Sequence, residues 1–185
     1  QNALAAALLA HQEGLSLSEI TDGLASFDGM KRRQEVRGCP HNILVIDDFA
    51  HHPTAVQATL EAVRAAHPER RLVAAFEPRS NSSRRKIFET AYGNAFDSAD
   101  RVFLKTPPVR HNDTEATMLD PETVVQMIQD RGPSATAFDD VDAMLPALAD
   151  VLRPGDVALL MSNGSFDGLH ERLLSTLEDM PSPIE

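Results

Sequence analysis

The sequence predicts an α/β domain whose mostly parallel sheet is covered by helices on both faces, preceded by a short helical hairpin. Three observations predict this fold. From residue 43 onward, short β-branched runs alternate with segments of helical periodicity, which is the order of strand–helix–strand units. The strand runs are almost continuously apolar, which is typical of strands buried on both faces. Before the first strand, two helical segments follow one another closely.

The hairpin begins with residues 2–12, which are predicted to be helical because Ala and Leu favour helices and Gly14 is a stop signal. Ser16 and Glu19 have the spacing of a capping box, which predicts a second helix through about Ala25. The chain enters this apolar stretch directly and has no initial Met, so we expect it to be part of a longer protein. Helical periodicity is then lost, and we expect residues 1–38 to end one domain and residues 39–185 to form the next.

Five strand runs are predicted in the second domain. They lie at residues 43–47, 71–76, 101–104, 135–138 and 157–161. Each is followed by a predicted helix, at residues 53–67, 83–96, 120–129, 140–152 and 168–180. Pro53 and Pro121 stand at first helical positions, where a missing N–H costs nothing. A polar loop that holds Arg110 and His111 separates the third strand from its helix.

Three of the strand runs end in unusually polar loops, "DFAHHP", "EPRSNSSR" and "SNGSFDG". In a parallel sheet the loops that follow the strands lie along the same edge, and ligands bind there. We therefore expect these three loops to converge on one site.

The first loop holds two acids and two imidazoles, Asp47, Asp48, His51 and His52. A strand-end carboxylate can accept two hydrogen bonds from a ribose diol, and acids at a helix entry are also favoured by the positive helix terminus. Asp and His are ordinary metal ligands. Adjacent histidines on an extended segment point in opposite directions, however, so we expect this segment alone to hold no metal.

The second loop contains Arg79, which can bind a carboxylate through two parallel hydrogen bonds. An alternative interpretation of this loop is a plain helix cap at Ser82 or Ser83. The third loop has two glycines, which allow close approach of the backbone to a ligand. The phosphate-binding loop with its lysine is absent from the sequence. The simplest interpretation of Arg32 and Arg33 is a solvated basic patch.

The composition excludes several classes of partner. The net charge is −11, from 28 acidic and 17 basic residues, so nucleic acid is not expected to bind. No apolar run reaches the roughly 18 residues of a membrane span. The single cysteine cannot form an internal disulfide, which suits a reducing cytoplasm, where we expect the protein to be found.

Together these segments resemble the carboxyl-terminal end of the Mur ligases, the ATP-dependent amide-forming enzymes of peptidoglycan assembly. "DDFAHHPTAV" is similar to the segment that opens their third domain, and "NALAAALLA" and "KRRQ" resemble the end of their central ATPase domain. "FEPRSNSSRR" and "MSNGSFDGLH" resemble the members that add a tripeptide. In members that add L-alanine, Tyr would be expected in place of Phe49, and a "PHRYTR"-like run in place of "PRSNSSR".

The resemblance implies a Rossmann-like carboxyl-terminal domain and a set of site residues. Asn2, Arg33 and Asp48 are expected to contact ATP, and His51 is expected to face the reaction centre as the catalytic residue. The amino substrate is expected to contact Phe49, Arg79, Ser80, Asn81, Ser162 and Asn163.

The resemblance also implies an activity. ATP would convert the carboxylate of UDP-N-acetylmuramate into an acyl phosphate, and the amine of L-Ala-γ-D-Glu-meso-diaminopimelate would displace phosphate, in peptidoglycan recycling. The cofactors would be ATP and Mg²⁺. The phosphate loop and the metal ligands are expected in upstream domains with which this chain would partner, so the chain alone is expected to be inactive.

The residues alone are also compatible with three other functions. An L-alanine-adding muramate ligase would share the reaction class. A metal-dependent phosphohydrolase would use the acids and imidazoles of the first loop. A stand-alone α/β module that binds a small molecule would begin at its own first strand, and the preceding helical hairpin argues against it.

Overall fold

The computed structural model describes residues 2–109 and 117–180, so Arg110 and His111 of the predicted polar loop lie outside the described residues. The chain divides into two compact units, residues 1–30 and residues 31–185. The domain boundary that the sequence predicted after residue 38 stays a prediction. The assignment of the first residues to a separate catalytic domain stays a prediction.

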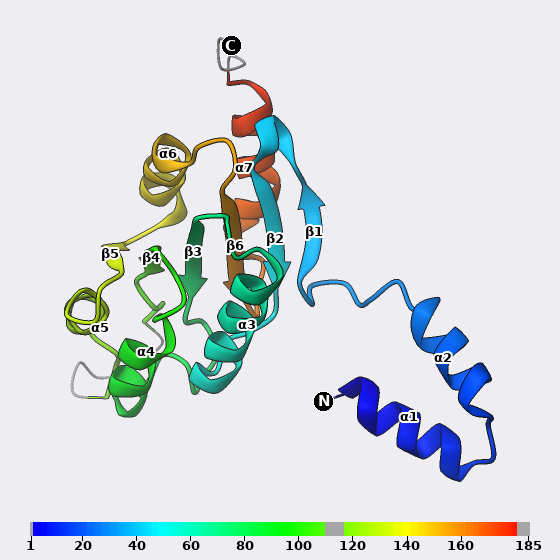
Figure 1. Cartoon of the computed structure of the whole chain (residues 1–185). Helices are drawn as coiled ribbons and strands as arrows, with labels where there is room; N and C mark the ends of the chain where they lie inside the picture. Colours follow the sequence, from blue (N-terminus) through cyan, green and yellow to red (C-terminus); the bar gives the residue numbers. More distant parts are fainter. Residues whose placement is uncertain (1, 110–116, 181–185) are drawn as a thin grey trace. The chain divides into compact units, whose positions relative to one another are not determined.

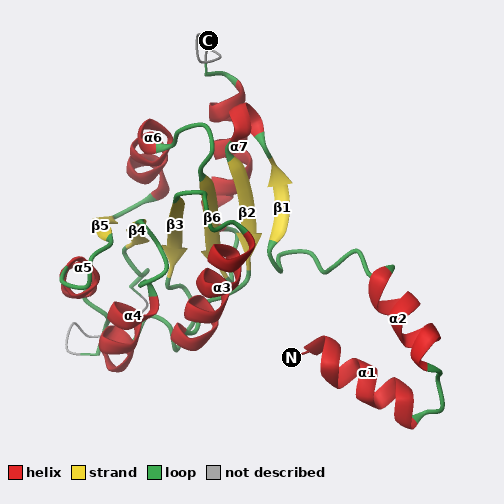
Figure 2. Cartoon of the chain, in the orientation of Figure 1, coloured by secondary structure: helices red, strands yellow, loops and turns green. Residues whose placement is uncertain are grey.

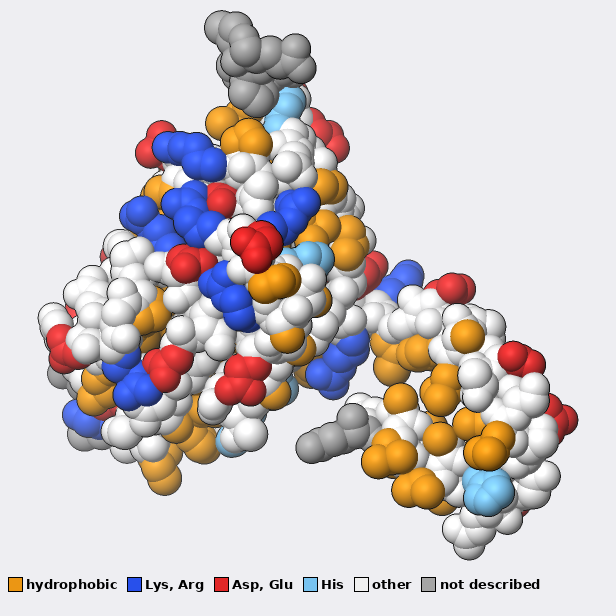
Figure 3. Space-filling view, viewed as in Figure 1, with side chains coloured by type: hydrophobic (Ala, Val, Ile, Leu, Met, Phe, Trp, Pro, Cys, Tyr) orange, Lys and Arg blue, Asp and Glu red, His pale blue; other side chains and the backbone are white. Residues whose placement is uncertain are grey.

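The amino-terminal unit is a hairpin of α1 (Asn2–Gln12) and α2 (Leu17–Ala25). The predicted capping box is confirmed: the Glu19 amide donates to the Ser16 hydroxyl at 3.3 Å, and the Ser16 amide donates to a Glu19 carboxylate oxygen at 2.9 Å. Ile20 is the one buried residue among the described residues of the two helices. Figure 3 shows the apolar side chains gathered on the surface of this hairpin.

The described residues of the second unit form a six-stranded sheet in the order β1-β2-β6-β3-β4-β5 (Figures 1 and 2). The strands are β1 (Glu35–Gly38), β2 (Leu44–Asp48), β3 (Leu72–Glu77), β4 (Arg101–Lys105), β5 (Ser134–Phe138) and β6 (Val157–Ser162). β1 pairs with β2 in the antiparallel sense, and all other pairs are parallel. The predicted mostly parallel sheet is confirmed.

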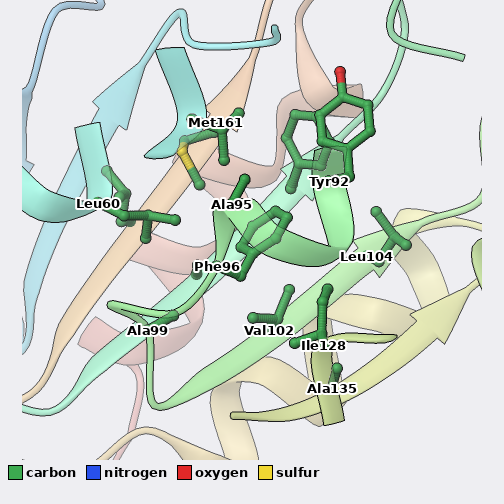
Figure 4. Close-up of a cluster of buried hydrophobic side chains, with 14 of the residues drawn as sticks. Leu60, Tyr92, Ala95, Phe96, Ala99, Val102, Leu104, Ile128, Ala135 and Met161 are labelled. Atoms are coloured by element: carbon green, nitrogen blue, oxygen red, sulfur yellow. The ribbon is translucent and has the colours of Figure 1, made fainter. Parts of the chain in front are cut away.

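Helices cover both faces of the sheet, as the sequence predicted. They are α3 (Pro53–Ala66), α4 (Glu89–Ala95), α5 (Pro121–Gln129), α6 (Val141–Val151) and α7 (Leu169–Glu178). Alternate residues of each central strand face opposite layers: Ala74 and Phe76 pack with α3, α4 and α5, while Val73 and Ala75 pack with α6 and α7. Figure 4 shows part of the first of these two cores. None of the helices in the described ranges is long and apolar enough to cross a membrane.

Two elements differ from the prediction. The strand β1 was not predicted, because a single apolar residue, Val36, stands in its four positions. The helix predicted over residues 83–96 is confirmed only from Glu89 onward. Before Glu89, the Ser83 amide donates a hydrogen bond to the Ser80 hydroxyl, and the Lys86 amide donates one to the Thr117 carbonyl. These bonds hold the segment in a turn, so the predicted cap at Ser82 or Ser83 is also wrong.

Candidate functional site

The three polar loops lie along one edge of the sheet, as predicted. β6 stands between β2 and β3, with Asp48 and Phe76 both in register with Met161 and with Glu77 in register with Ser162. The loops that follow these parallel strands therefore lie side by side at the carboxyl ends of the strands. We call this edge, from residues 47–52, 77–83 and 162–168, the carboxyl rim.

Asp48 lies at the end of β2 and is only 3% exposed. Its Oδ1 accepts hydrogen bonds from the Ala50 amide at 2.7 Å and the Thr59 hydroxyl at 3.3 Å, and its Oδ2 accepts one from the Gln34 amide at 2.9 Å. A carboxylate has about four acceptor positions, so one remains, on Oδ2. A contact with both hydroxyls of a ribose would require the Gln34 bond to open. The predicted ATP contact of Asp48 stays a prediction.

The segment before β1 contacts the rim at Phe49. The Phe49 amide donates to the Arg32 carbonyl at 2.9 Å. The guanidinium groups of Arg32 and Arg33 lie 5.3 and 5.6 Å from the centre of the Phe49 ring, within the range of cation–π attraction. Arg33 is exposed, so its charge can meet an anion beside Phe49, as the predicted nucleotide contact requires.

Arg32 joins this segment to the third loop. Its Nη2 donates to the carbonyl oxygens of Ser162 at 2.5 Å and Gly164 at 2.7 Å, and its amide donates to Glu35 at 2.7 Å. The expectation of a solvated basic patch is therefore wrong for Arg32. Its partners are distant in the sequence, so the basic run "KRR" alone could not show them.

Asp47 faces a pocket of about 230 Å³ between the end of β2 and the start of α7. One of its carboxylate oxygens lies 3.1 Å from His170 Nε2, and Arg32 and Arg37 approach within 3.4 and 3.5 Å. Burial alone would raise the pKa of Asp47, but His170 and Arg32 outweigh burial and hold this pKa below its ordinary value. Asp47 is thus a buried anion among three basic side chains.

The lowered pKa of Asp47 predicts how stability depends on pH. A carboxyl whose pKa is lower in the folded protein stabilises it fully above the unfolded pKa of about 3.9, and this contribution is lost as the pH falls through the folded value. We expect the difference in unfolding free energy between wild type and Asp47→Asn to shrink as the pH falls below about 4. Denaturant titrations between neutral and acid pH would measure it, and a constant difference would contradict the role of the charge.

The two histidines of the first loop have separate surroundings. His51 Nδ1 lies 3.0 Å from the Phe49 carbonyl, and His52 packs edge-on against Phe88 at 5.3 Å between ring centres. A carbonyl oxygen only accepts, so Nδ1 of His51 carries the proton, and Nε2 of a neutral ring is left as an acceptor. The Tyr92 hydroxyl donates to the His51 carbonyl at 2.5 Å and fixes this backbone. Burial raises the pKa of Tyr92, which keeps the donor protonated.

Arg79 lies directly against the third loop. A Cβ atom added at Gly164 would stand 2.5 Å from Cδ of Arg79 and 2.7 Å from its Nη1, so the absence of a side chain at residue 164 makes room for the arginine. Nη1 of Arg79 is also 3.5 Å from the Ser165 hydroxyl. The second and third loops therefore meet at this contact, and Arg79 is half-buried within it.

The other predicted substrate residues occupy the same region with different roles. The Ser80 hydroxyl accepts from the Ser83 amide at 3.0 Å and donates to the Ser83 hydroxyl at 2.8 Å, so it shapes its own turn. Asn81 is exposed, and its Oδ1 accepts from Arg84 at 3.4 Å. Among the described residues, Oδ1 of Asn163 is buried and has no hydrogen-bond partner. A buried carbonyl oxygen of this kind favours a bound donor.

The structure also shows charged residues in and beside the rim that the sequence alone did not single out. Ser162 is fully buried and donates its hydroxyl to Glu77 Oε2 at 2.6 Å. Glu77 Oε1 accepts from Lys105 Nζ at 3.0 Å, and the same ammonium donates to Asp167 at 2.6 Å. Glu77 and Lys105 both end apolar strand runs, and this is the signal that could have found them.

The rim thus brings together Asp48, Phe49 and His51 from the first loop with Arg79, Ser162 and Asn163 from the other two. Asn2 begins α1 in the amino-terminal unit, and its predicted contact with ATP stays a prediction. Within the described ranges, no three His, Cys, Asp or Glu side chains gather to hold a metal. The groups that fit ATP are the remaining acceptor of Asp48 in the rim and the exposed guanidinium of Arg33 beside it.

Comparison with known proteins identifies the family and supports the fold. Residues 32–164 match the family described as Mur ligase, glutamate ligase domain. A crystal structure of a murein peptide ligase from Psychrobacter arcticus 273-4 superposes with a TM-score of 0.74 and 33% identity, over 98% of this chain and 37% of that one.

Relatives with two different amine substrates are similar to this chain. UDP-N-acetylmuramate–L-alanyl-γ-D-glutamyl-meso-2,6-diaminoheptandioate ligase of Escherichia coli strain K12 is 36% identical over 95% of this chain and 36% of its own length. UDP-N-acetylmuramate–L-alanine ligase of Desulforapulum autotrophicum is 34% identical over 95% of this chain and 38% of its own length. The chain therefore spans little more than a third of these relatives and is about equally similar to both classes.

Proposed function

Because the chain belongs to the Mur ligase family, we propose that it is the carboxyl-terminal part of an ATP-dependent ligase that joins L-Ala-γ-D-Glu-meso-diaminopimelate to UDP-N-acetylmuramate. The observation that carries the proposal is the meeting of Arg79 with the third loop at Gly164 on the carboxyl rim. This contact places a cation on the loop next to that of Asn163, whose Oδ1 has no hydrogen-bond partner among the residues that the structure describes.

These two groups suit an acidic peptide that carries a free amine. The guanidinium of Arg79 can bind a carboxylate through two parallel hydrogen bonds. The Oδ1 of Asn163 can accept a hydrogen bond from an ammonium group, which would satisfy a buried acceptor. L-Alanine offers one carboxylate close to its amine, whereas the tripeptide offers several carboxylates further away. The choice of the tripeptide rests on the loop sequences "EPRSNSSR" and "SNGSFDG".

The proposed reaction assigns roles to Arg33, Asp48 and His51. ATP supplies the phosphoryl group that converts the muramyl carboxylate into an acyl phosphate. Arg33 and Asp48 would contact the nucleotide, and Nε2 of His51 would accept a proton from the ammonium group of the amine substrate, which becomes a neutral amine. The amine then attacks the carbonyl carbon and phosphate leaves. An acyl phosphate hydrolyses when water reaches it, so we propose that this domain closes over upstream domains that hold Mg²⁺ and the muramyl substrate.

The proposal is tested with the full-length protein that contains this chain, supplied with ATP, Mg²⁺, UDP-N-acetylmuramate and either the tripeptide or L-alanine. Phosphate release and the mass of the product are measured. We expect kcat/KM to be at least about 100-fold higher with the tripeptide, because binding groups that L-alanine lacks would contribute. A preference for L-alanine would instead assign the protein to the L-alanine-adding members. The present chain alone is expected to form no product.

A further inference from the structure

An ion triad of Glu77, Lys105 and Asp167 joins the second and third loops of the carboxyl rim. Glu77 and Lys105 end β3 and β4, and the exposed Asp167 lies in the loop that follows β6. Lys105 is 9% exposed and Glu77 is 1% exposed. The ammonium group lies 3.0 Å from Glu77 Oε1 and 2.6 Å from Asp167 Oδ2. Burial alone would lower the pKa of Lys105, but the contacts with Asp167 and Glu77 outweigh burial and raise it, so the ammonium group is charged at neutral pH.

The triad continues into the third loop through Ser162. Glu77 uses its second oxygen, Oε2, to accept the Ser162 hydroxyl at 2.6 Å, and this hydroxyl accepts the Gly164 amide at 2.9 Å. Lys105 is therefore connected to both ends of the loop from Ser162 to Asp167. It is connected to the start through Glu77 and to the end by direct contact.

The end of this loop has a backbone that needs such support. Phe166 and Asp167 both have φ near +48°, in the left-handed region that residues other than Gly rarely adopt. Side chains persist in this region when surrounding contacts hold them there. The ion pair of Asp167 with Lys105 and the fully buried ring of Phe166 are the contacts that do so.

We propose that Lys105 is a positioning residue, which sets the distance between Arg79 on the second loop and the Ser162–Asn163 turn on the third. This inference rests on the proposed function, since it assigns the two loops to one docking site for the amine substrate. Lys105 acts through these loops, because the acids of the triad take two of the three donors of its ammonium group and the residue is only 9% exposed. Loss of Lys105 would leave Glu77 as an uncompensated buried charge and would release the end of the loop.

The test compares three variants of the full-length enzyme. For Lys105→Met we expect KM for the amine substrate to rise about tenfold while KM for ATP stays within about twofold, together with a lower melting temperature. In the double variant Lys105→Met/Glu77→Gln the uncompensated charge is gone. We expect its melting temperature to recover most of the loss while KM for the amine substrate stays raised. Arg131→Gln removes the same charge from an exposed ion pair with Asp97 and should change neither quantity.

The outcomes separate this inference from the proposed function. The proposed function is tested first, by measuring whether the wild type turns over the tripeptide, L-alanine or neither. The variants are then measured with the amine substrate that the wild type uses. Hydrogen exchange of the Gly164 and Gly168 amides in the present chain gives a readout that needs no turnover, and both should exchange faster in the double variant. If KM recovers together with the melting temperature, or if exchange of both amides is unchanged, the positioning role of Lys105 is wrong.

Discussion

Substitution of Gly164 by alanine is expected to lower kcat/KM for the amine substrate of the full-length enzyme by about two orders of magnitude. The new methyl group would stand 2.5 Å from Cδ, 2.7 Å from Nη1 and 2.9 Å from Nε of Arg79. Three atoms in the outer part of the arginine side chain would overlap with it, so the guanidinium group has to shift. A shift of about 1 Å in a positioning group is enough for a loss of this size.

The backbone would tolerate the change, because Gly164 is not among the residues with positive φ in the described ranges. The expected loss therefore comes through Arg79. If so, Gly164→Ala should cause little further loss in a protein that already carries Arg79→Ala, so the two effects should not add. Gly23→Ala is the matched control, since an added Cβ there meets nothing within 4 Å. Additive losses at residues 79 and 164 would contradict the contact between the two loops.

Replacement of Phe96 by alanine is expected to lower the unfolding free energy of the carboxyl-terminal unit by about 3 to 5 kcal/mol. The Phe96 ring is fully buried and lies 5.8 Å from the ring of Phe76. It fills the space between Leu60, Val102 and Ile128 (Figure 4). The substitution removes most of a large apolar side chain and leaves a cavity that the packed strands and helices cannot close.

Chemical denaturation measures this loss. Tyr92 is the single tyrosine, the chain has no tryptophan, and Tyr92 is fully buried in the same core, so its fluorescence reports the unfolding of this unit. Ile87→Ala provides the control, because Ile87 is 81% exposed and its truncation should change stability by less than about 0.5 kcal/mol. Equal effects of the two substitutions would show that Phe96 is not part of the core.

The central fold could be predicted because its signals are local. Each buried strand of the parallel sheet is a short apolar run, and each is followed by a segment of helical periodicity. The elements that were missed depend on partners far away in the chain. β1 exists because residues 35–38 pair with β2, and the turn before Glu89 is held by residues 117–119. The secondary-structure propensities of the residues within such a segment give no information about these distant partners.

The same distinction applies to the candidate site. The convergence of the three loops followed from the rule that parallel strands end at one edge, so Arg79 and Asn163 could be placed in one region from the sequence. The individual contacts could not be predicted. Asp48 accepts a hydrogen bond from the Gln34 amide in the segment before β1, and Lys105 forms ion pairs with two acids from other segments. Both depend on distances between strands, which the order of residues does not give.

The position of β6 has a consequence for how the protein is made. β6 is the last strand of the sheet to be synthesised, yet it pairs with β2 on one side and β3 on the other. While the ribosome is still adding residues before Val157, β2 and β3 each present an open edge, and such edges can pair with other chains. Completion of the sheet, and with it the assembly of the rim, therefore waits for nearly the whole segment to emerge, so a stalled or shortened nascent chain is exposed to aggregation.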